Sequence, residues 1–556
     1  MFASHQRDRQ FRVAALTGAI ALALTAGAAD AATQSKERKN MDRLGHTDLQ
    51  GRPAYQPNVI QYPDGRWYLF VGMHSGVPDG RVTSCPAGTL PNPLNGNACE
   101  NNGTMIIDVT DPENPVEKAL IPAPAGGQAQ MVRMCLGKDL PAGPPDKAQR
   151  VYLQRNVQGG ASAGYQVYDV TNPSAPVKVS EITGIRSTHK QWWECTTGIT
   201  YAPGSKSTAP LWRQSQSMLV YYWGNPTAAP TYIRTFGLPG AQPTGTGTAP
   251  ASLHGAISAF EHPQAGQKLA RGHDVIGNRI YAAWGVGDDG VMTIIDRKKL
   301  LPPAYGGTWN SANPDSPTEA ELIGPSSPTV GYFLMSPDQG GHTSMPVFGM
   351  KPPSIQRYNE FQTRDIVLLA SEATADGVDG RCNEAPHWSF VVDVTVENSM
   401  TAPPGTRVEH DPYHGPMNLS TMSVDPRAGE AYPRGNYCGR GARFGVHSSE
   451  ENFRNPFYGK LTAIAYFNGG VRIWDIREPQ APREVAFYVP EANALTSSDG
   501  YMTNNVEIDN RGYVYIVDRN GAGMDVLQIT GCAKQIIDKN HVCQDLGNNN
   551  AAKNND

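Results

Sequence analysis

Four histidines of this 556-residue sequence recur at one position, just ahead of strand-like runs. They are His189 in "STHKQWWECTTGITYA", His273 in "RGHDVIGNRIYAAWG", His342 in "GGHTSMPV" and His447 in "GVHSSEE". Imidazole is a common ligand for zinc, copper, iron and nickel. If the four side chains meet in space, they could hold a divalent transition metal, and we consider Cu, Fe and Zn.

Charged residues near these histidines are candidate catalytic groups. Glu194 follows His189 closely, while Glu450 and Glu451 follow His447. A carboxylate could orient an imidazole or serve as a general base, and Arg443 could bind an anionic substrate. In the alternative interpretation the acids are solvated in loops, and the histidines bond backbone groups or water in the absence of any metal.

A second pattern determines how these residues are positioned. The segments 104–116 ("TMIIDVTDPENPV"), 165–177 ("YQVYDVTNPSAPV") and 471–483 ("VRIWDIREPQAPR") share an aspartate followed by proline at +4 and +7. Alternating apolar residues before the aspartate predict a half-buried strand. The Asp side chain can bond nearby turn amides, and the prolines prevent further ladder bonding. Each segment therefore predicts a strand, a rigid turn and another strand.

Weaker copies and strand-like runs fill the rest of the chain. Seven such runs precede the repeated segments, helix signals are scarce, and Gly (58) and Pro (45) are abundant. Many short strands at regular intervals without helical crossovers favour a closed antiparallel propeller. We expect an all-β protein with a single β-propeller of seven blades with four antiparallel strands each, six or eight blades being the alternatives.

The repeated segments resemble those of a known family. "GGVRIWDIREPQAPREVAFYVP" and "MIIDVTDPENPV" are similar to the LVIVD-repeat β-propeller proteins of bacteria. The resemblance extends over most of the chain and is weakest in the third and fifth units. It implies an exported or surface propeller and no single activity, so function depends on a site.

In a propeller the innermost strands run along the central channel, where residues at equivalent positions form a ring. The spacing places Asn58, Gln128 or Gln130, the four histidines and Asn505 in this ring. Four histidines from consecutive blades would then converge at one mouth of the channel. The histidines with no shared repeat position are expected outside it: His254, His262, His387, His410 and His414.

The ends of the chain and the cysteines indicate export. A basic start, the apolar run "VAALTGAIALALTAGAA" and Ala29-Asp30-Ala31 are typical of a cleaved secretory signal. Eight cysteines in an exported chain favour disulfides. A local pairing is one of 105 connectivities: Cys85–Cys99, Cys135–Cys195, Cys382–Cys438 and Cys532–Cys543. We expect a signal peptide (1–31), a linker (32–43), the propeller (44–531), and a disulfide loop with a disordered tail (532–556).

Composition excludes other classes of function. The formal net charge of −5, or −6 without residues 1–31, is unlike the basic footprint of a nucleic-acid binder. No later stretch reaches membrane-spanning length, and the GxSxG and HExxH signatures are absent. We therefore expect a periplasmic or secreted propeller whose channel mouth binds a metal ion or a small polar ligand, as a metal-dependent oxidoreductase or lyase. The alternative is a non-enzymatic envelope module whose loops bind or adhere to another protein.

Overall fold

A computed structural model describes residues 34–81, 84–270, 272–285, 289–354, 363–372, 387–397, 415–425 and 437–543. The chain divides into two compact units, residues 1–34 and residues 35–556. The predicted signal peptide (1–31), Cys382, His410, His414 and the predicted tail from residue 544 onward lie outside the described residues.

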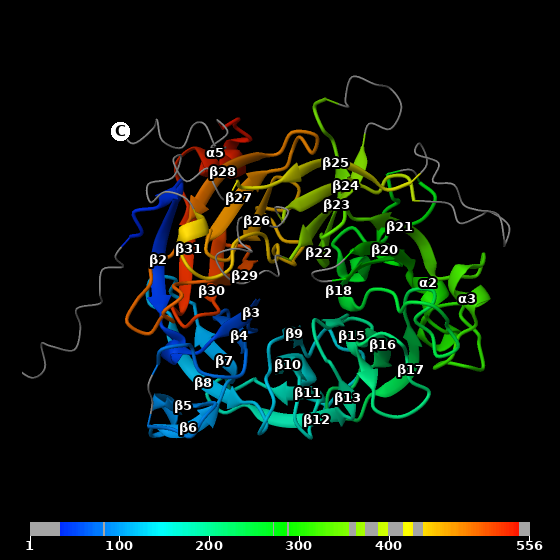
Figure 1. Cartoon of the computed structure of the whole chain (residues 1–556), viewed down its shortest axis with the longest axis horizontal. Helices are drawn as coiled ribbons and strands as arrows, with labels where there is room; N and C mark the ends of the chain where they lie inside the picture. Colours follow the sequence, from blue (N-terminus) through cyan, green and yellow to red (C-terminus); the bar gives the residue numbers. More distant parts are fainter. Residues whose placement is uncertain are drawn as a thin grey trace, which may run out of the picture. The chain divides into compact units, whose positions relative to one another are not determined.

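Residues 35–556 form a β-propeller of seven antiparallel sheets, as predicted (Figure 1). Blades 1 to 3 follow the chain in order. Blade 1 contains β3 (Ala54–Gln61), β4 (Trp67–Met73), β7 (Gly103–Asp108) and β8 (Val116–Pro122). Blade 2 contains β9 (Val132–Leu136), β10 (Val151–Val157), β11 (Gly164–Asp169) and β12 (Val177–Thr183). Blade 3 contains β14 (Trp192–Trp193), β15 (Ile199–Lys206), β16 (Ser217–Tyr222) and β17 (Thr231–Phe236), with the short β13 (Ile185–Arg186) also paired to β15.

Blades 4 and 5 continue this order. Blade 4 contains β18 (Leu253–Ser258), β19 (Arg279–Trp284), β20 (Val291–Asp296) and β21 (Thr329–Leu334). Blade 5 contains β22 (Gly341–Met350), β23 (Arg364–Ser371), β24 (Ser389–Asp393) and β25 (Met417–Met422). In Figure 1 the first strands of the sheets, such as β3, β9, β18 and β22, lie nearest the middle of the ring.

The last two blades are completed by the beginning of the described chain. Blade 6 contains β26 (Leu461–Ala465), β27 (Val471–Asp475) and β28 (Arg483–Tyr488), and its outer strand is β1 (Arg38–Lys39). Blade 7 contains β29 (Thr503–Ile508), β30 (Tyr513–Asp518) and β31 (Met524–Ile529), and its outer strand is β2 (Met41–Thr47). Residues 38–43, expected in a linker, are therefore strands that close the ring, because the edges of β28 and β31 need hydrogen-bonding partners.

The predicted Asp-Pro turn is present in all three strong copies. The Asp108 carboxylate accepts a hydrogen bond from the Thr110 amide at 3.1 Å, and Asp169 and Asp475 make the same contact two residues ahead at 3.0 and 3.1 Å. Asp108, Asp169 and Asp475 end β7, β11 and β27, and the next strand begins directly after the second proline in each case. The turn therefore fixes the outer hairpin of blades 1 and 2 and the β27–β28 hairpin of blade 6.

Other elements are short. The helices among the described residues are α2 (Arg297–Leu300), α3 (Glu319–Ile323) and α5 (Gly531–Lys539), and the 3-10 turns are η1 (Leu49–Gly51), η2 (Pro93–Asn95), η3 (Lys147–Gln149), η4 (Ala259–Glu261), η5 (Ile276–Asn278), η6 (Pro303–Tyr305) and η8 (Tyr437–Gly439). A hairpin of β5 (Thr89–Asn92) and β6 (Ala98–Asn101) extends from blade 1. Within the part of the chain that the structure describes, no helix is long and apolar enough to cross a membrane.

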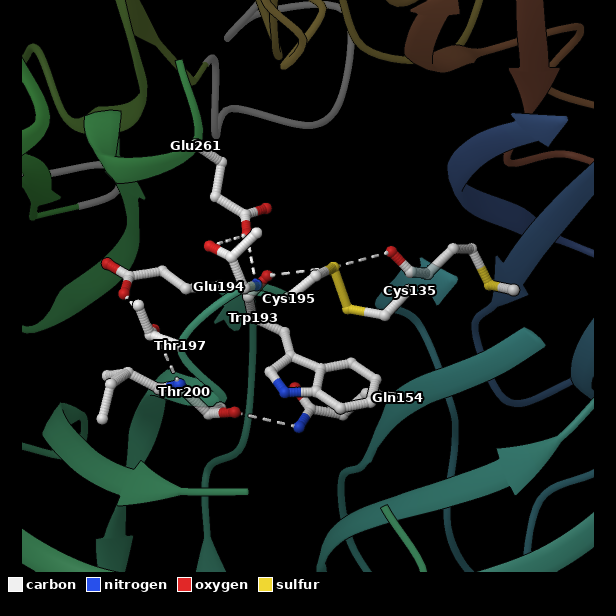
Figure 2. The surroundings of a disulfide bond; sticks show 11 residues. Cys135, Gln154, Trp193, Glu194, Cys195, Thr197, Thr200 and Glu261 are labelled. Atoms are coloured by element: carbon white, nitrogen blue, oxygen red, sulfur yellow. Dashed lines mark hydrogen bonds between the residues drawn. A yellow bond between two sulfur atoms is a disulfide. The ribbon is translucent and has the colours of Figure 1, made fainter. Parts of the chain in front are cut away.

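Three of the predicted disulfides are confirmed: Cys85–Cys99, Cys135–Cys195 and Cys532–Cys543. Cys438 also forms a disulfide, and its predicted partner Cys382 lies outside the described residues. Figure 2 shows the Cys135–Cys195 bond, which joins the inner strand β9 of blade 2 to Cys195, two residues after the end of β14 of blade 3. It therefore ties neighbouring blades together close to the axis.

Candidate functional site

Four imidazoles and one phenol form a closed circle of side chains at the axis. Consecutive ring centroids are 4.3 Å apart for His189–His254, 3.8 Å for His254–His342 and 4.3 Å for His342–His447. Tyr55 closes the circle, with its ring centroid 5.4 Å from that of His447 and 5.8 Å from that of His189. The circle therefore brings together side chains from blades 3, 4, 5, 6 and 1.

The inner strands position these residues. Tyr55 lies on β3, His254 on β18 and His342 on β22, while His189 precedes β14. His447 lies in the segment before β26, and its amide donates to the Ala465 carbonyl at 2.9 Å. A fifth histidine, His74, directly follows β4 and packs edge-on against Tyr55, with 4.7 Å between the ring centroids. We call His74, His189, His254, His342 and His447 the histidine cluster.

Backbone carbonyls determine the tautomers of two members. His447 Nδ1 lies 2.6 Å from the Asn504 carbonyl oxygen, and His254 Nδ1 lies 3.2 Å from the His342 carbonyl oxygen. Because a carbonyl oxygen can only accept, each Nδ1 must carry the proton. The Nε2 atom of each neutral ring is therefore an acceptor, and that of His447 lies 3.3 Å from the Tyr55 hydroxyl.

Burial keeps the cluster uncharged. It lowers the pKa of His254, His342 and His447 well below the usual value, and nearby positive charges lower it further. Burial, with the charges of Lys190 and Arg519, lowers the pKa of His189 to about 3. Neutral imidazoles are the form that binds metal ions.

A carboxylate completes a candidate ligand set. Glu372, which follows β23, lies beside the circle, with its Oε1 atom 3.6 Å from His447 Nε2. Ligand atoms of His254, His342 and Glu372 all lie within 4.8 Å of one another, and the three residues are buried. His342 Nε2 has no hydrogen-bond partner among the described residues. Two histidines and one carboxylate with open positions are a typical ligand set for a mononuclear metal ion.

A cavity of 690 Å³ opens beside these residues. Tyr55, His74, His189, His254 and Glu372 line it on the axis side. The rest of its wall comes from loops of blades 3, 4 and 7, including Ser215, Gln216, residues 248–252, Asp289 and Arg519. The volume is in the range of small-molecule sites.

A second group of polar residues fills the axis next to the cluster. Glu451 forms ion pairs with both Lys190 and Arg133, and all three are buried. Lys190 Nζ also donates to Thr343 Oγ1 at 2.7 Å, and Thr343 Oγ1 lies 2.8 Å from His342 Nδ1. We call Arg133, Lys190 and Glu451 the charged layer, and it contacts the histidine cluster through Thr343.

Gly255 leaves room for this layer. It pairs with Lys190 across the two inner strands, and a Cβ atom at Gly255 would lie 2.9 Å from Lys190 Cδ. The lysine side chain therefore passes over the glycine to reach Glu451. Burial raises the pKa of Glu451, but the two neighbouring cations outweigh it, so the pKa is lowered overall and the carboxyl stays ionised.

Three of the four predicted histidines meet, and the fourth does not. His273 lies outside the cavity, with its side chain 37% exposed and its Nε2 atom 2.8 Å from Glu397 Oε2. The prediction that His273 belongs to the ring was therefore wrong. His254, which was expected outside the ring, lies there instead. The reason is a long connection, 259–278, between β18 and β19, so that the strand after His273 is the second strand of blade 4.

The predicted catalytic residues have different neighbours. Glu194 is ion-paired with Arg297 and accepts hydrogen bonds from Tyr201 and Ser258, next to the disulfide in Figure 2. Glu450 accepts from the Thr462 hydroxyl and the Ala463 amide, and burial raises its pKa to about 8. The described contacts of both carboxylates include no member of the histidine cluster.

Arg443 is connected to the site through its ion pair with Glu372. Its guanidinium lies 3.1 Å from Glu372 Oε1. The arginine that lines the cavity is Arg519.

The other predicted ring positions fall close to the axis. Gln130 Nε2 lies 2.7 Å from His74 Nδ1, and Gln128 bonds Gln158 instead. Asn505 bonds Gln56, while its neighbour Asn504 is the residue whose carbonyl contacts His447. Asn58 contacts Glu507 and no member of the cluster among the described residues.

Five residues of the site were missed: Tyr55, His74, His254, Glu372 and Arg519. Tyr55 stands three residues before the predicted ring position Asn58 on the same strand, and the register of β3 shifts between Ala54 and Pro57, so regular alternation from Asn58 does not lead to it. His74, Glu372 and Arg519 each follow the second strand of a blade directly (β4, β23 and β30). This shared position, at the end of a second strand, is a sequence signal that could have predicted them. The strand runs concerned are "RWYLFVGMH", "DIVLLASE" and "GYVYIVDRN".

Comparisons with known proteins add little to the geometry. No protein-family model and no curated protein matches the chain. Solved structures similar to it include a protein from Lactobacillus plantarum (TM-score 0.42, 9% identity, 80% of this chain and 88% of that chain). The Dos1 propeller (0.38, 9%, 88% and 96%) and hydrazine synthase from Kuenenia stuttgartiensis (0.39, 11%, 86% and 96%) are also similar. At these scores the likenesses carry no functional argument, and the LVIVD-repeat assignment stays a prediction.

Proposed function

We propose that this protein is an exported metalloprotein that binds one transition-metal ion at His254, His342 and Glu372 and acts on a small polar molecule in the adjoining cavity. The single observation that carries the proposal is the convergence of three buried ligand groups within 4.8 Å beside a cavity of 690 Å³. The three disulfides described above support export, since such bonds persist in oxidising compartments.

The residues suit a metal better than a purely structural role. The His342 Nε2 and His189 Nδ1 atoms are buried without hydrogen-bond partners among the described residues. A buried polar atom without a partner costs about 1–3 kcal/mol, so a protein that kept these atoms only for stability would be less stable than one with apolar side chains there. A bound ion would satisfy His342 Nε2 and offset the burial cost of Glu372.

The ligand set favours Fe(II), because two histidines and one carboxylate with open positions are typical of non-haem iron. Copper and zinc also bind imidazole, and copper binds most divalent sites more tightly. The bound metal would supply Lewis-acid or redox chemistry to a molecule in the cavity. The protein contributes neutral imidazoles and the Glu372 carboxylate, which pairs with Arg443. We propose an oxidoreductase or lyase activity on this basis.

Metal analysis tests the proposal. The exported protein is stripped of metal and reloaded separately with Fe(II) under anaerobic conditions, Cu(II) and Zn(II), and the bound metal is measured by mass spectrometry. We expect about one ion per chain. The variants His254→Ala, His342→Ala and Glu372→Gln should weaken binding by more than about 100-fold, since loss of outer-shell partners alone costs about 10- to 100-fold.

His273→Ala is the matched control, because His273 also contacts a carboxylate but lies outside the cavity. It should bind metal like the unmodified protein. Absence of binding for all three metals, or equal binding by His342→Ala, would contradict the proposal and favour the non-enzymatic binding module.

A further inference from the structure

The cavity wall also carries a cation, whose charge acts on Glu372 among other groups. Arg519 directly follows β30 of blade 7 and lines the cavity together with Tyr55, His74, His189 and Glu372. Its charge contributes to lowering the pKa of His74, His189 and His447. Its positive charge therefore acts on several groups around the cavity at once.

A neutral donor accompanies this cation. With the Gln130 amide in its present orientation, its nitrogen donates to His74 Nδ1 at 2.7 Å. Nδ1 is then an acceptor, so the proton of the neutral ring is on Nε2. The His74 Nε2 atom is buried and has no hydrogen-bond partner among the described residues, and His74 lines the cavity. It is therefore an unpartnered donor at the same wall as Arg519.

The charge around the cavity also favours an anion. The acids in its wall are Glu372 and Asp289, and Arg443 pairs with Glu372. The histidines are neutral. A divalent ion bound as proposed would bring the charge of these groups to about +2, counting Arg443 and Arg519. Electrostatic attraction of this kind selects ligands of opposite charge and suppresses those of like charge.

We propose that the molecule bound in this cavity is a small carboxylate, with its carboxylate group held by the Arg519 guanidinium and the His74 Nε2–H. This inference rests on the metal site proposed above. Planar guanidinium groups match carboxylates with two parallel hydrogen bonds. One arginine and one neutral donor suit a single negative charge, whereas a phosphate dianion would need further cations.

Matched ligand pairs test this proposal. The zinc-loaded protein is titrated with propionate, with propionamide, which has the same shape without the charge, and with inorganic phosphate. Binding is followed by NMR of the ligand. We expect propionate to bind at least about tenfold more tightly than propionamide, as a charge-assisted hydrogen bond would give. Phosphate should bind more weakly than propionate.

The variant Arg519→Gln should reduce the preference for propionate to less than about threefold. Arg66→Gln is the matched control, because Arg66 is an arginine on blade 1 whose side chain is 52% exposed and paired with Asp64. It should keep the full preference. His74→Phe, which retains a ring against Tyr55 but loses Nε2–H, should reduce the preference in part.

Several outcomes would overturn the inference. They are equal affinities for propionate and propionamide, an equal loss of both in Arg519→Gln, or tighter binding of phosphate. The comparison on the unmodified protein needs no variant, so equal affinities there overturn the inference even if Arg519→Gln does not fold. Zinc content is measured on the same samples. A protein without zinc would show that the metal site has failed, whereas a loaded protein without the preference would show that only the carboxylate assignment has failed.

Discussion

The two groups of polar side chains on the propeller axis differ in how they are satisfied. In the charged layer, Glu451 pairs with Lys190 and Arg133, so the buried charges compensate one another within the protein. In the histidine cluster, His342 Nε2 and His74 Nε2 have no partners among the described residues. Two members of the charged layer lie close in sequence to cluster members, since Lys190 follows His189 and Glu451 lies four residues after His447.

This difference distinguishes side chains on the axis that stabilise the fold from side chains that form the candidate site. Fully paired buried charges can be explained by folding alone, because each compensates the desolvation of the others. Buried polar atoms without partners lower stability, so their presence needs another reason. The candidate metal site lies in the group whose polar atoms are not all paired within the protein. Two experiments test whether the two groups differ in this way, and a third tests a buried carboxyl beside the charged layer that lacks such a partner.

The largest effect is expected from Glu451→Ala. The change leaves Lys190 and Arg133 buried without their carboxylate, and removing one partner of a buried ion pair costs about 3–5 kcal/mol. Equilibrium unfolding in urea, with the disulfides intact, should show this loss in the free energy of unfolding. Asp64→Asn, at a solvent-exposed ion pair, is the control and should leave the unfolding midpoint unchanged. A loss below about 1 kcal/mol for Glu451→Ala would mean that the layer is hydrated rather than mutually compensated.

A smaller effect is expected from Thr343→Val, where the two groups touch. Thr343 Oγ1 contacts both His342 Nδ1 and Lys190 Nζ, so its loss should change the orientation of the His342 ring. Changes of this kind lower metal affinity by about 10- to 100-fold. Competition with a metal chelator measures the affinity. Thr343→Ser retains the hydroxyl and should restore most of the binding; equal weakening by both variants would show that the hydroxyl has no such role.

The smallest effect, when it is stated per pH unit, concerns Glu450, a buried carboxyl beside the charged layer whose described contacts include no cation. Burial raises its pKa to about 8 in the folded protein, against about 4.3 in an unfolded chain. Between these values the folded state keeps the proton and the unfolded state loses it. Stability should therefore fall as pH rises through this window, by up to about 1.4 kcal/mol per pH unit.

Urea unfolding at several pH values between 5 and 8 measures this slope. Other buried acids also contribute to the slope of the unmodified protein, so the difference from Glu450→Gln isolates the share of Glu450. The variant should show a flatter profile. Identical slopes would mean that Glu450 is ionised in the folded state.

The fold could be predicted from the sequence because its signals are local. The Asp108, Asp169 and Asp475 turns each lie within a few residues, and their side-chain hydrogen bonds form as expected. The disulfide of Cys135 with Cys195 was one of the local pairings that the order of the cysteines suggested. The role of residues 38–43 could not be predicted in this way, because their partners in β28 and β31 are distant in the sequence.

The site was predictable only where it follows the repeat. His189, His342 and His447 occupy equivalent positions and were found. His254 was missed because the connection 259–278 contains another histidine, His273, ahead of a convincing strand. Glu372 and Arg519 lie at the ends of second strands, so only the closed ring of blades brings them to the histidines. Their proximity to the histidines depends on tertiary structure, and the spacing of residues within one repeat does not predict it.

The way the ring closes affects the order in which the blades can be completed. Ser35, just ahead of β1, bonds the carbonyl of Val489, 454 residues later in the chain. A ribosome adds about 5–20 residues per second, so the first strands wait roughly 20–90 s for their partners to be made. During this interval β1 and β2 have no sheet to join. Blades 1 to 5 are built from segments that follow one another in the chain, whereas blades 6 and 7, which include His447 and Arg519, are complete only after β1 and β2 have joined them.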